Sequence, residues 1–239
     1  MLITTNAIVL SKLKYKDNDL IVKCYTQQLG VVSFLLRGVL KSKKGSAKTA
    51  YFQLFSQLQL VIDHKNNRTL HTIKETKLNH LYSSLHTHVL KSAIVMFLAE
   101  VLTNTLKEEE QNETLFSYIE TTLLWLDNHS EYSNFHLLFL LNFTKYLGFY
   151  PDLNNTEYPF FNLSDGKFEN KKSDKYSISG ENLLLLKQLL GTTFDALSSV
   201  KINAKQRQSF LSMILLYFEL HLGSFKTPKS LQIFNQVFS

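Results

Sequence analysis

The hydrophobic pattern of this chain changes its period near residue 80, and this change constrains the fold more than any other feature. Before it, apolar residues come in short runs with partial alternation, as in the stretch 52–62, which is typical of strands. After it, apolar residues recur every three or four positions, as at Ile94, Phe97, Leu98 and Val101, which is typical of helices packed on a core. The sequence therefore predicts a β module followed by a helical region.

Five strand-like segments fit into the first 80 residues with no helical pattern between them. They are rich in β-branched and aromatic residues and are separated by turn sequences such as Leu29-Gly30. Five short strands in a module of this size favour a partly open, five-stranded β-barrel of the OB type. The predicted strands lie at about residues 7–10, 20–25, 31–36, 52–62 and 70–77.

The remaining residues predict an all-α domain with one small insertion. Ser179 is expected to cap one helix, and Thr227-Pro228 is expected to open a short last one. The irregular stretch 152–176 includes a predicted hairpin around Asp165-Gly166. The fold class is therefore α+β, with an OB domain over 1–80 and a helical domain over 81–239. Helical spacing covers residues 94–106, 113–126, 132–147, 180–190 and 204–221.

Positive charge is concentrated in the β module. Residues 1–80 hold 13 Lys and Arg against 4 Asp and Glu, whereas residues 81–239 hold 13 against 16. This asymmetry indicates an anionic partner, such as nucleic acid or a membrane surface, unless the lysines only keep the module soluble. A membrane surface would favour a basic amphipathic helix, and these residues lie in predicted strands and loops. Nucleic acid is the better fit.

Two basic clusters are the candidate DNA-binding residues. One is the sequence RGVLKSKKGSAK at 37–48, between the third and fourth strands, and the other lies in the first inter-strand connection. Lysine and arginine neutralise backbone phosphates. Tyr15 and Tyr51 would either stack on bases or pack in the barrel, and the sequence favours neither alternative. The candidates are Lys12, Lys14, Tyr15, Lys16, Arg37, Lys41, Lys43, Lys44 and Lys48.

No catalytic or metal-binding motif is found along the sequence. A phosphate-binding loop needs four residues between its glycines, whereas six separate Gly38 from Gly45. The only cysteine, Cys24, excludes an intrachain disulfide and a cysteine-based zinc site, and is expected to be a buried, inert thiol. His136 and His221 are expected to be hydrogen-bonded histidines at the edge of the core. We expect no enzyme, no cofactor, no metal and no small-molecule substrate.

The start of the chain and its cysteine content predict a location. Residues 1–6 have no basic segment or apolar core of a signal peptide, and the longest apolar runs are short and interrupted. A single cysteine is typical of a reducing compartment. We expect a cytoplasmic protein without membrane contact, associated with the nucleoid if its partner is DNA.

Several dispersed segments carry a resemblance to a known family. Residues 7–10, 15–22 and 25–30 are similar to its first strands, and Arg37-Gly38 with the basic loop is similar to its Lys/Arg-Gly segment. Leu147-Gly148-Phe149-Tyr150-Pro151 matches "Leu-Gly-Phe-x-Pro". His221-Leu222, followed by Lys229-Ser230, matches a "His-Leu … Lys-Ser" ending. In this order and spacing the chain resembles the DNA repair protein RecO family of recombination mediators.

The resemblance implies an OB domain, a helical domain and a role in RecF-type homologous recombination. It implies binding of single- and double-stranded DNA, annealing of complementary strands, and help in loading the RecA recombinase onto coated single strands. The implied partners are RecR and the acidic C-terminal tail of single-strand-binding protein. That tail would need a basic, partly apolar groove. Lys201, Lys205 and Arg207 are candidates for it from charge alone, with a solvated helix start as the alternative.

One departure from the family pattern concerns metal. Many members carry a four-cysteine zinc site after "Gly-Phe-x-Pro", whereas residues 152–168 of this chain contain no cysteine. We expect Phe160, Phe161 and the Asp165-Gly166 turn to fill that place by packing.

Two other function classes stay open at this point. One is an RNA-binding OB protein, because no residue here reads the 2′-hydroxyl. The other is a non-catalytic interaction scaffold whose basic loop docks acidic proteins, which competition between an oligonucleotide and an acidic peptide would distinguish.

Overall fold

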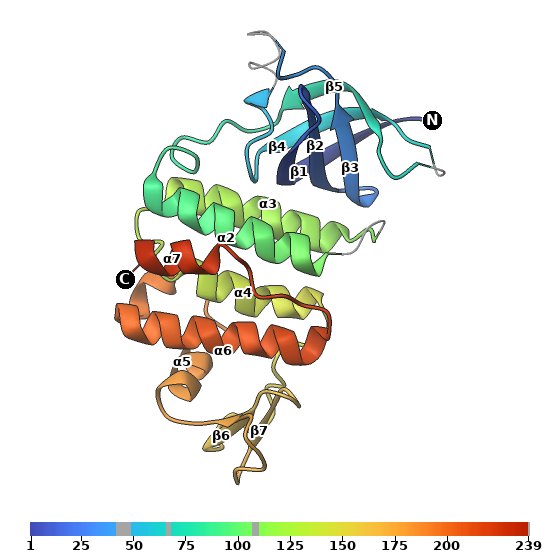
Figure 1. The fold of residues 1–239 in the computed structure, drawn as a ribbon. Helices are drawn as coiled ribbons and strands as arrows, with labels where there is room; N and C mark the ends of the chain where they lie inside the picture. The colour runs from blue at the N-terminus through green and yellow to red at the C-terminus, as the bar shows by residue number, and fades with distance from the viewer. Residues whose placement is uncertain (42–48, 66–67, 107–109, 239) are drawn as a thin grey trace. The chain divides into compact units, whose positions relative to one another are not determined.

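The computed structural model describes residues 1–41, 49–65, 68–106 and 110–238 (Figure 1). The chain divides into two compact units, Met1–Asn128 and His129–Ser239, so the first two long helices belong with the strands. The helices of the described residues are too short or too polar to cross a membrane. The first unit contains β1 (Leu2–Tyr15), β2 (Asp19–Thr26), β3 (Gly30–Leu36), β4 (Gln57–Asp63), β5 (Thr72–Leu78), α2 (Val89–Thr105) and α3 (Glu113–Asn128).

The strands of the first unit form one antiparallel sheet in the order β3-β2-β1-β4-β5. Its two edge strands approach each other at a parallel bridge between Phe34 and His71. There the Leu35 N–H donates to the His71 carbonyl at 3.1 Å, and the His71 N–H donates to the Ser33 carbonyl at 2.9 Å. The sheet thus curls into a loose, partly open barrel, which confirms the predicted five-stranded OB-type architecture.

The barrel core follows from the alternation of side chains along each strand. Cys24 of β2 is fully buried in this core, and burial raises the pKa of its thiol, so the thiol stays protonated and unreactive, as the sequence predicts. The other members of the core are Ala7, Val9, Leu20, Val22, Val32, Phe34, Phe52, Leu58, Leu60 and Ile62.

Three predicted strand limits are wrong, and the first is the start of β1, which lies at Leu2 and not near residue 7. β1 continues to Tyr15, so Lys12 and Lys14 lie on a strand and not in the first connection. The fourth strand begins at Gln57 and not at residue 52, because the preceding residues form a turn in which Phe55 has a φ of 64°. The turn buries the Phe55 side chain, and its N–H donates to the Val9 carbonyl at 2.7 Å. Phe52 and Phe55 are therefore buried by a turn before β4 and not by the strand itself.

Helix α3 and the connection before it pack on the barrel through few, specific contacts. The rings of Tyr25 and Phe116 have their centroids 5.9 Å apart, and the Tyr25 hydroxyl donates to the Asn112 carbonyl at 3.0 Å. The connection also passes close to the β2–β3 turn. Gly30 has a φ of 64°, and a Cβ there would lie 2.6 Å from backbone atoms of Glu110, so only glycine fits.

A buried carboxylate holds the segment between the barrel and α2. Oδ1 of Asp127, at the end of α3, accepts the N–H groups of Ser84 at 2.8 Å and Leu85 at 2.7 Å, and Oδ2 accepts the N–H of Ser83 at 2.9 Å. The buried Lys91 ammonium donates to the Asp127 carbonyl at 2.8 Å. Burial alone would raise the pKa of Asp127, but these hydrogen bonds outweigh it and lower the pKa to about 2.

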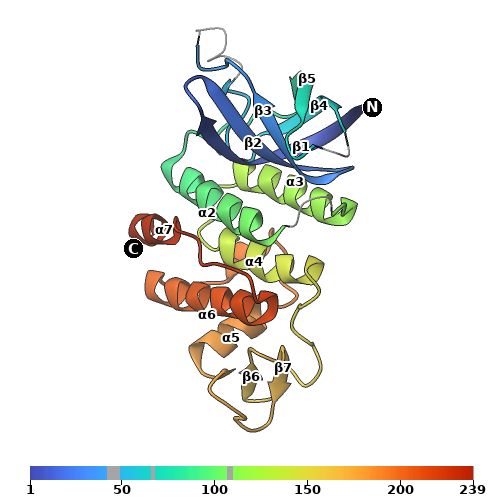
Figure 2. The same cartoon turned by 45° about the vertical axis from the view of Figure 1, so that its right-hand side comes forward.

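The second unit is helical, with a small three-stranded sheet inserted after α4 (Figure 2). Strands β6 and β7 form the predicted hairpin around Asp165-Gly166, and β8 pairs with β6. Contacts join α6 to both α4 and α5. The elements are α4 (Phe135–Tyr146), β6 (Phe160–Asn162), β7 (Lys167–Glu169), β8 (Ser177–Ile178), α5 (Glu181–Leu189), a 3₁₀ turn (Leu197–Ser199), α6 (Ala204–Leu222) and α7 (Leu231–Val237).

Aromatic side chains join the hairpin region to α6. The ring of Phe149 stacks on His221 with a centroid separation of 4.9 Å, and Phe161 packs edge-on against Phe168 at 5.0 Å. The Tyr217 hydroxyl donates to the Phe149 carbonyl at 2.7 Å. A ring nitrogen of His221 lies 2.9 Å from the Leu163 carbonyl oxygen, so His221 is the hydrogen-bonded histidine that the sequence predicts.

The two predicted helix caps, Ser179 and Thr227, are wrong by one and three residues. Helix α5 is capped by Gly180, with a φ of 66°, and not by Ser179. Helix α7 begins at Leu231 and not at Pro228, because the Thr227 hydroxyl donates to the Glu219 carboxylate at 2.6 Å and does not cap the helix. In both places the chain bends before the helix, which residue preference alone does not reveal.

The Asp127 cluster predicts a pH-dependent stability for the first unit. Because the folded pKa is depressed, the stabilisation is complete above the unfolded value of 3.8 and is lost as the pH falls towards about 2. We expect Asp127→Asn to cost about 2 kcal/mol at neutral pH and almost nothing near pH 2. Urea unfolding followed by fluorescence of Trp125, the only tryptophan, reports on this unit. An equal loss at both pH values would contradict the role of the charge.

Candidate nucleic-acid interface

The β1–β2 turn and the base of the basic loop are joined by hydrogen bonds. The Gly38 N–H donates to Oδ1 of Asp19 at 2.8 Å, and the Leu40 N–H donates to the Asn18 carbonyl at 3.1 Å. Gly38 has a φ of 65°, a conformation that glycine adopts without strain. These bonds fix where the basic loop leaves the barrel.

As a result, members of the two predicted basic clusters lie together. Lys16, Arg37 and Lys41 line one open hollow of about 400 Å³. Asp17 and Asp19 line it as well, and Asp19 is engaged by the Gly38 backbone. Three cations from two segments distant in sequence therefore surround one surface hollow, which suits a phosphate backbone. The other predicted loop residues, Lys43, Lys44 and Lys48, lie outside the described residues.

The remaining candidates lie on the last part of β1. Lys12 and Lys14 are exposed and two residues apart, so they share one face of the strand. Tyr15 is 38% exposed and is not packed inside the barrel. The Lys16 ammonium lies 5.4 Å from the centroid of its ring, so a charge and an aromatic face are presented side by side.

A second cavity, of about 600 Å³, lies between β3 and β5 where the sheet is open. Arg37 contributes to its rim as well, together with Arg68 and Lys74, which the sequence analysis did not select. Lys74 belongs to β5 and Arg68 lies shortly before it. The sequence does not reveal that these two residues lie near Arg37, because only the folded barrel brings β3 and β5 together. We call this cavity the seam cavity. Its further lining residues are Leu35, Leu36, Val39, Tyr51, Phe52, Thr72, Ile73 and Thr76.

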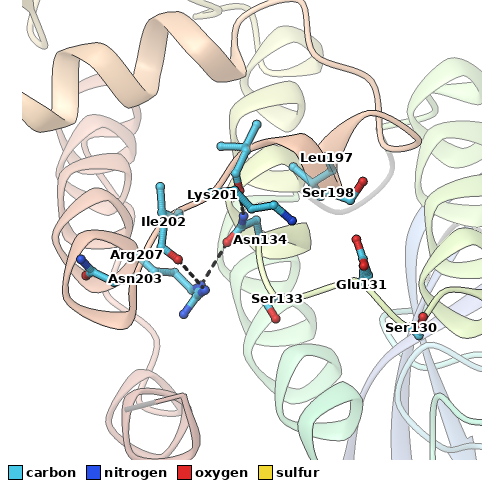
Figure 3. A pocket seen from close by; sticks show the side chains of 11 residues that line it. Ser130, Glu131, Ser133, Asn134, Leu197, Ser198, Lys201, Ile202, Asn203 and Arg207 are labelled. Atoms are coloured by element: carbon cyan, nitrogen blue, oxygen red, sulfur yellow. Dashed lines mark hydrogen bonds between the residues drawn. The ribbon is translucent and has the colours of Figure 1, made fainter.

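The second unit has its own basic pocket, of about 600 Å³, at the start of α6 (Figure 3). Lys201 and Arg207, two of the three residues selected for a protein partner, line it, whereas Lys205 is not among its lining residues. The pocket mixes charged and apolar side chains. The other lining residues are Ser130, Glu131, Ser133, Asn134, Leu197, Ser198, Val200, Ile202 and Asn203.

Arg207 is held in a fixed position within this pocket. Its Nε donates to Oδ1 of Asn134 at 3.1 Å, as a dashed line in Figure 3 indicates. The Asn134 side chain in turn donates to the Val200 carbonyl at 2.7 Å. A capping box between Asn203 and Gln206 fixes the first turn of α6, with bonds of 2.9 and 3.0 Å. The Arg207 guanidinium is therefore half-buried and oriented, and is not part of a solvated helix start.

His136, next to this pocket in α4, is not the satisfied histidine that the sequence predicts. It is fully buried, and neither ring nitrogen has a hydrogen-bond partner among the described residues. Its ring packs against Phe234 and Phe238 at the C-terminal end, with centroid separations of 4.7 and 5.8 Å. Burial, with a smaller contribution from the Arg207 charge, lowers the pKa of His136 to about 3, so the ring is neutral.

Comparison with known proteins identifies relatives along the whole chain. Residues 1–82 match the family described as "Recombination protein O N terminal", and residues 86–231 match "Recombination protein O C terminal". The chain is 50% identical over 238 residues to "DNA repair protein RecO" of Christiangramia forsetii, 44% identical over 239 residues to that of Flavobacterium johnsoniae, and 34% identical over 242 residues to that of Bacteroides fragilis. Each alignment covers 100% of both chains.

His136 predicts acid sensitivity of the second unit. Its pKa is depressed in the folded state relative to the ordinary value of 6.5, so the unfolded chain binds the proton first and stability falls as the pH drops below 6.5. Between a pH above 6.5 and pH 5, we expect the free energy of unfolding of the second unit to fall by about 2 kcal/mol. In His136→Leu this pH-dependent decrease should be absent. Amide hydrogen exchange in α4, corrected for the intrinsic effect of pH, measures this. The exposed His129→Gln serves as control, and an unchanged pH dependence in His136→Leu would refute the prediction.

Proposed function

The chain belongs to the recombination protein O family, and on this basis we propose that it is a non-catalytic mediator of recombination in DNA repair. In this proposal it binds single- and double-stranded DNA, anneals complementary strands and helps to load RecA onto single strands coated by single-strand-binding protein. It acts on the nucleoid in the cytoplasm. RecR is proposed as a partner from family resemblance alone, without a docking face.

The observation that best supports the DNA-binding part is the meeting of Lys16, Arg37 and Lys41 around one hollow on the barrel. Phosphates attract such cations without reference to sequence, and the affinity then falls steeply with salt. Lys12 and Lys14 extend the positive surface along β1, and Tyr15 adds an exposed ring beside them. Lys43, Lys44 and Lys48 complete the proposed contact set by their place in the same loop sequence.

The pocket at the start of α6 supports the proposed contact with the acidic tail of single-strand-binding protein. An acidic peptide with apolar residues needs cations beside apolar side chains, and Lys201 and Arg207 lie there with Leu197 and Ile202. Arg207 is already oriented by its hydrogen bond to Asn134, so little side-chain entropy is lost on binding. Lys205, in the same first turn of α6, would add charge at the edge.

Changing Lys41, Lys43 and Lys44 together to alanine tests the DNA-binding surface. We expect weaker binding of a labelled single strand and a flatter salt dependence, with a slope reduced by about 0.7 for each phosphate that the variant no longer neutralises. Fluorescence anisotropy across a salt titration measures both quantities. A matching RNA strand in parallel reports whether the surface prefers DNA.

The matched control removes the same charge from exposed lysines of the second unit, Lys171, Lys172 and Lys175. It should leave the salt slope unchanged. If the loop variant binds like the unmodified protein at every salt concentration, the site lies elsewhere. If no oligonucleotide binds even at low salt, the loop meets an acidic protein and the DNA-binding proposal is wrong.

Opposite substitutions test the acidic-tail pocket. We expect Lys201→Ala to weaken binding of a labelled acidic peptide about two- to fivefold, and Glu131→Gln to tighten it by a similar factor, because each changes one exposed charge at the rim. The surface variant Lys172→Ala is the control. Changes in the same direction for both variants would contradict an electrostatic pocket at this place.

A further inference from the structure

The seam cavity exists because the barrel is closed at one end only. Backbone hydrogen bonds join β3 to His71, and beyond this residue the described parts of β3 and β5 are not paired. Backbone N–H and C=O groups along such an open edge can bond a partner. The cavity of about 600 Å³ lies at this opening and has the size of a small-ligand site.

The floor of the cavity is apolar. Phe52 is 3% exposed, and its ring belongs to the barrel core. The half-buried side chains of Leu36, Val39 and Ile73 pack against the same core and line the cavity. Tyr51 lies beside them, but 42% of its surface is exposed. The cavity thus offers a dry floor and one accessible aromatic ring.

The rim of the cavity is positive. Arg37, Arg68 and Lys74 are exposed there, and no acidic residue is found among the described residues that line it. Thr72 and Thr76 add hydroxyl groups, which can donate or accept hydrogen bonds. A ligand suited to this lining has a flat apolar body, polar edges and a negative charge close by. A nucleotide has all three.

We infer that the seam cavity takes one unstacked base of a DNA strand, with Tyr51 against the base and Arg37, Arg68 and Lys74 around its phosphates. This inference rests on the proposed DNA binding and adds to it a site that acts on the base itself. The hollow formed by Lys16, Arg37 and Lys41 contacts the backbone, whereas the seam cavity requires a free base. Arg37 lines both and would hold the strand between them.

The inference gives the barrel a reason to prefer single strands. A base inside a duplex is paired and stacked, and removing it costs a few kcal/mol, whereas a single strand offers the base without that cost. Stacking on an aromatic side chain depends little on base identity. The cavity would therefore distinguish strandedness without reading sequence.

The test compares two ligands of the same length and charge. One is oligothymidylate of about ten nucleotides, within the range of OB-fold binding sites, and the other is an abasic strand with the same number of phosphates. We expect the full-length protein to bind the thymidylate roughly 5- to 150-fold more tightly, the effect of one stacked base. Tyr51→Ala should lose most of this preference and keep its affinity for the abasic strand.

Two further variants make the result specific. Tyr51→Phe keeps the ring and should keep the preference, whereas Tyr176→Ala, a tyrosine of the second unit, should behave like the unmodified protein. Equal binding of both ligands by the unmodified protein overturns the inference and leaves the proposed DNA binding intact. A preference that persists in Tyr51→Ala also overturns it. Failure of both ligands to bind at low salt refutes the proposed function itself.

Discussion

The closure of the barrel at His71 is the constraint on which the first unit depends. A five-stranded sheet has two free edges, and here two backbone hydrogen bonds join them at one end. The closed end shields the core around Phe34, and the open end exposes the seam cavity. The connection after β3 contributes Arg37, Val39, Tyr51 and Phe52 to that opening. The position of the positive surface is thus a result of incomplete closure.

A second constraint acts through charge inside the first unit. The Asp127 carboxylate accepts three backbone N–H groups of the segment 83–85. These hydrogen bonds take the place of those that the carboxylate would make to water. These bonds fix the path of the chain as it leaves the barrel and enters α2. In the second unit, the Asn134 side chain performs a comparable task, because it donates to the Val200 carbonyl in the segment that leads into α6. Each unit therefore uses one buried polar side chain to place a segment that carries no regular structure.

Much of the architecture could be predicted from the sequence because hydrophobic period reports burial directly. The five strands, the helices and the Asp165-Gly166 hairpin depend on local patterns. The limits of elements were less predictable where a long-range bond decides them, as the Phe55 turn bonds Val9 and Thr227 bonds Glu219. Charge selected Arg37, Lys41 and Arg207 but not Arg68 or Lys74, because their grouping depends on which strands become neighbours. Nothing in the sequence around His136 indicates that both of its ring nitrogens lack a hydrogen-bond partner among the described residues.

The close approach of Gly30 to Glu110 has a consequence for how this chain can vary. Position 30 is restricted twice, once by its backbone angle and once by the space that the connection between α2 and α3 leaves. A change elsewhere that made space for a side chain at position 30 would leave the positive φ, which side chains disfavour. No single compensating substitution therefore makes another residue acceptable at this position. Substitutions of Gly30 should therefore rarely be tolerated, even though Glu110, which restricts it, lies 80 residues further along the chain.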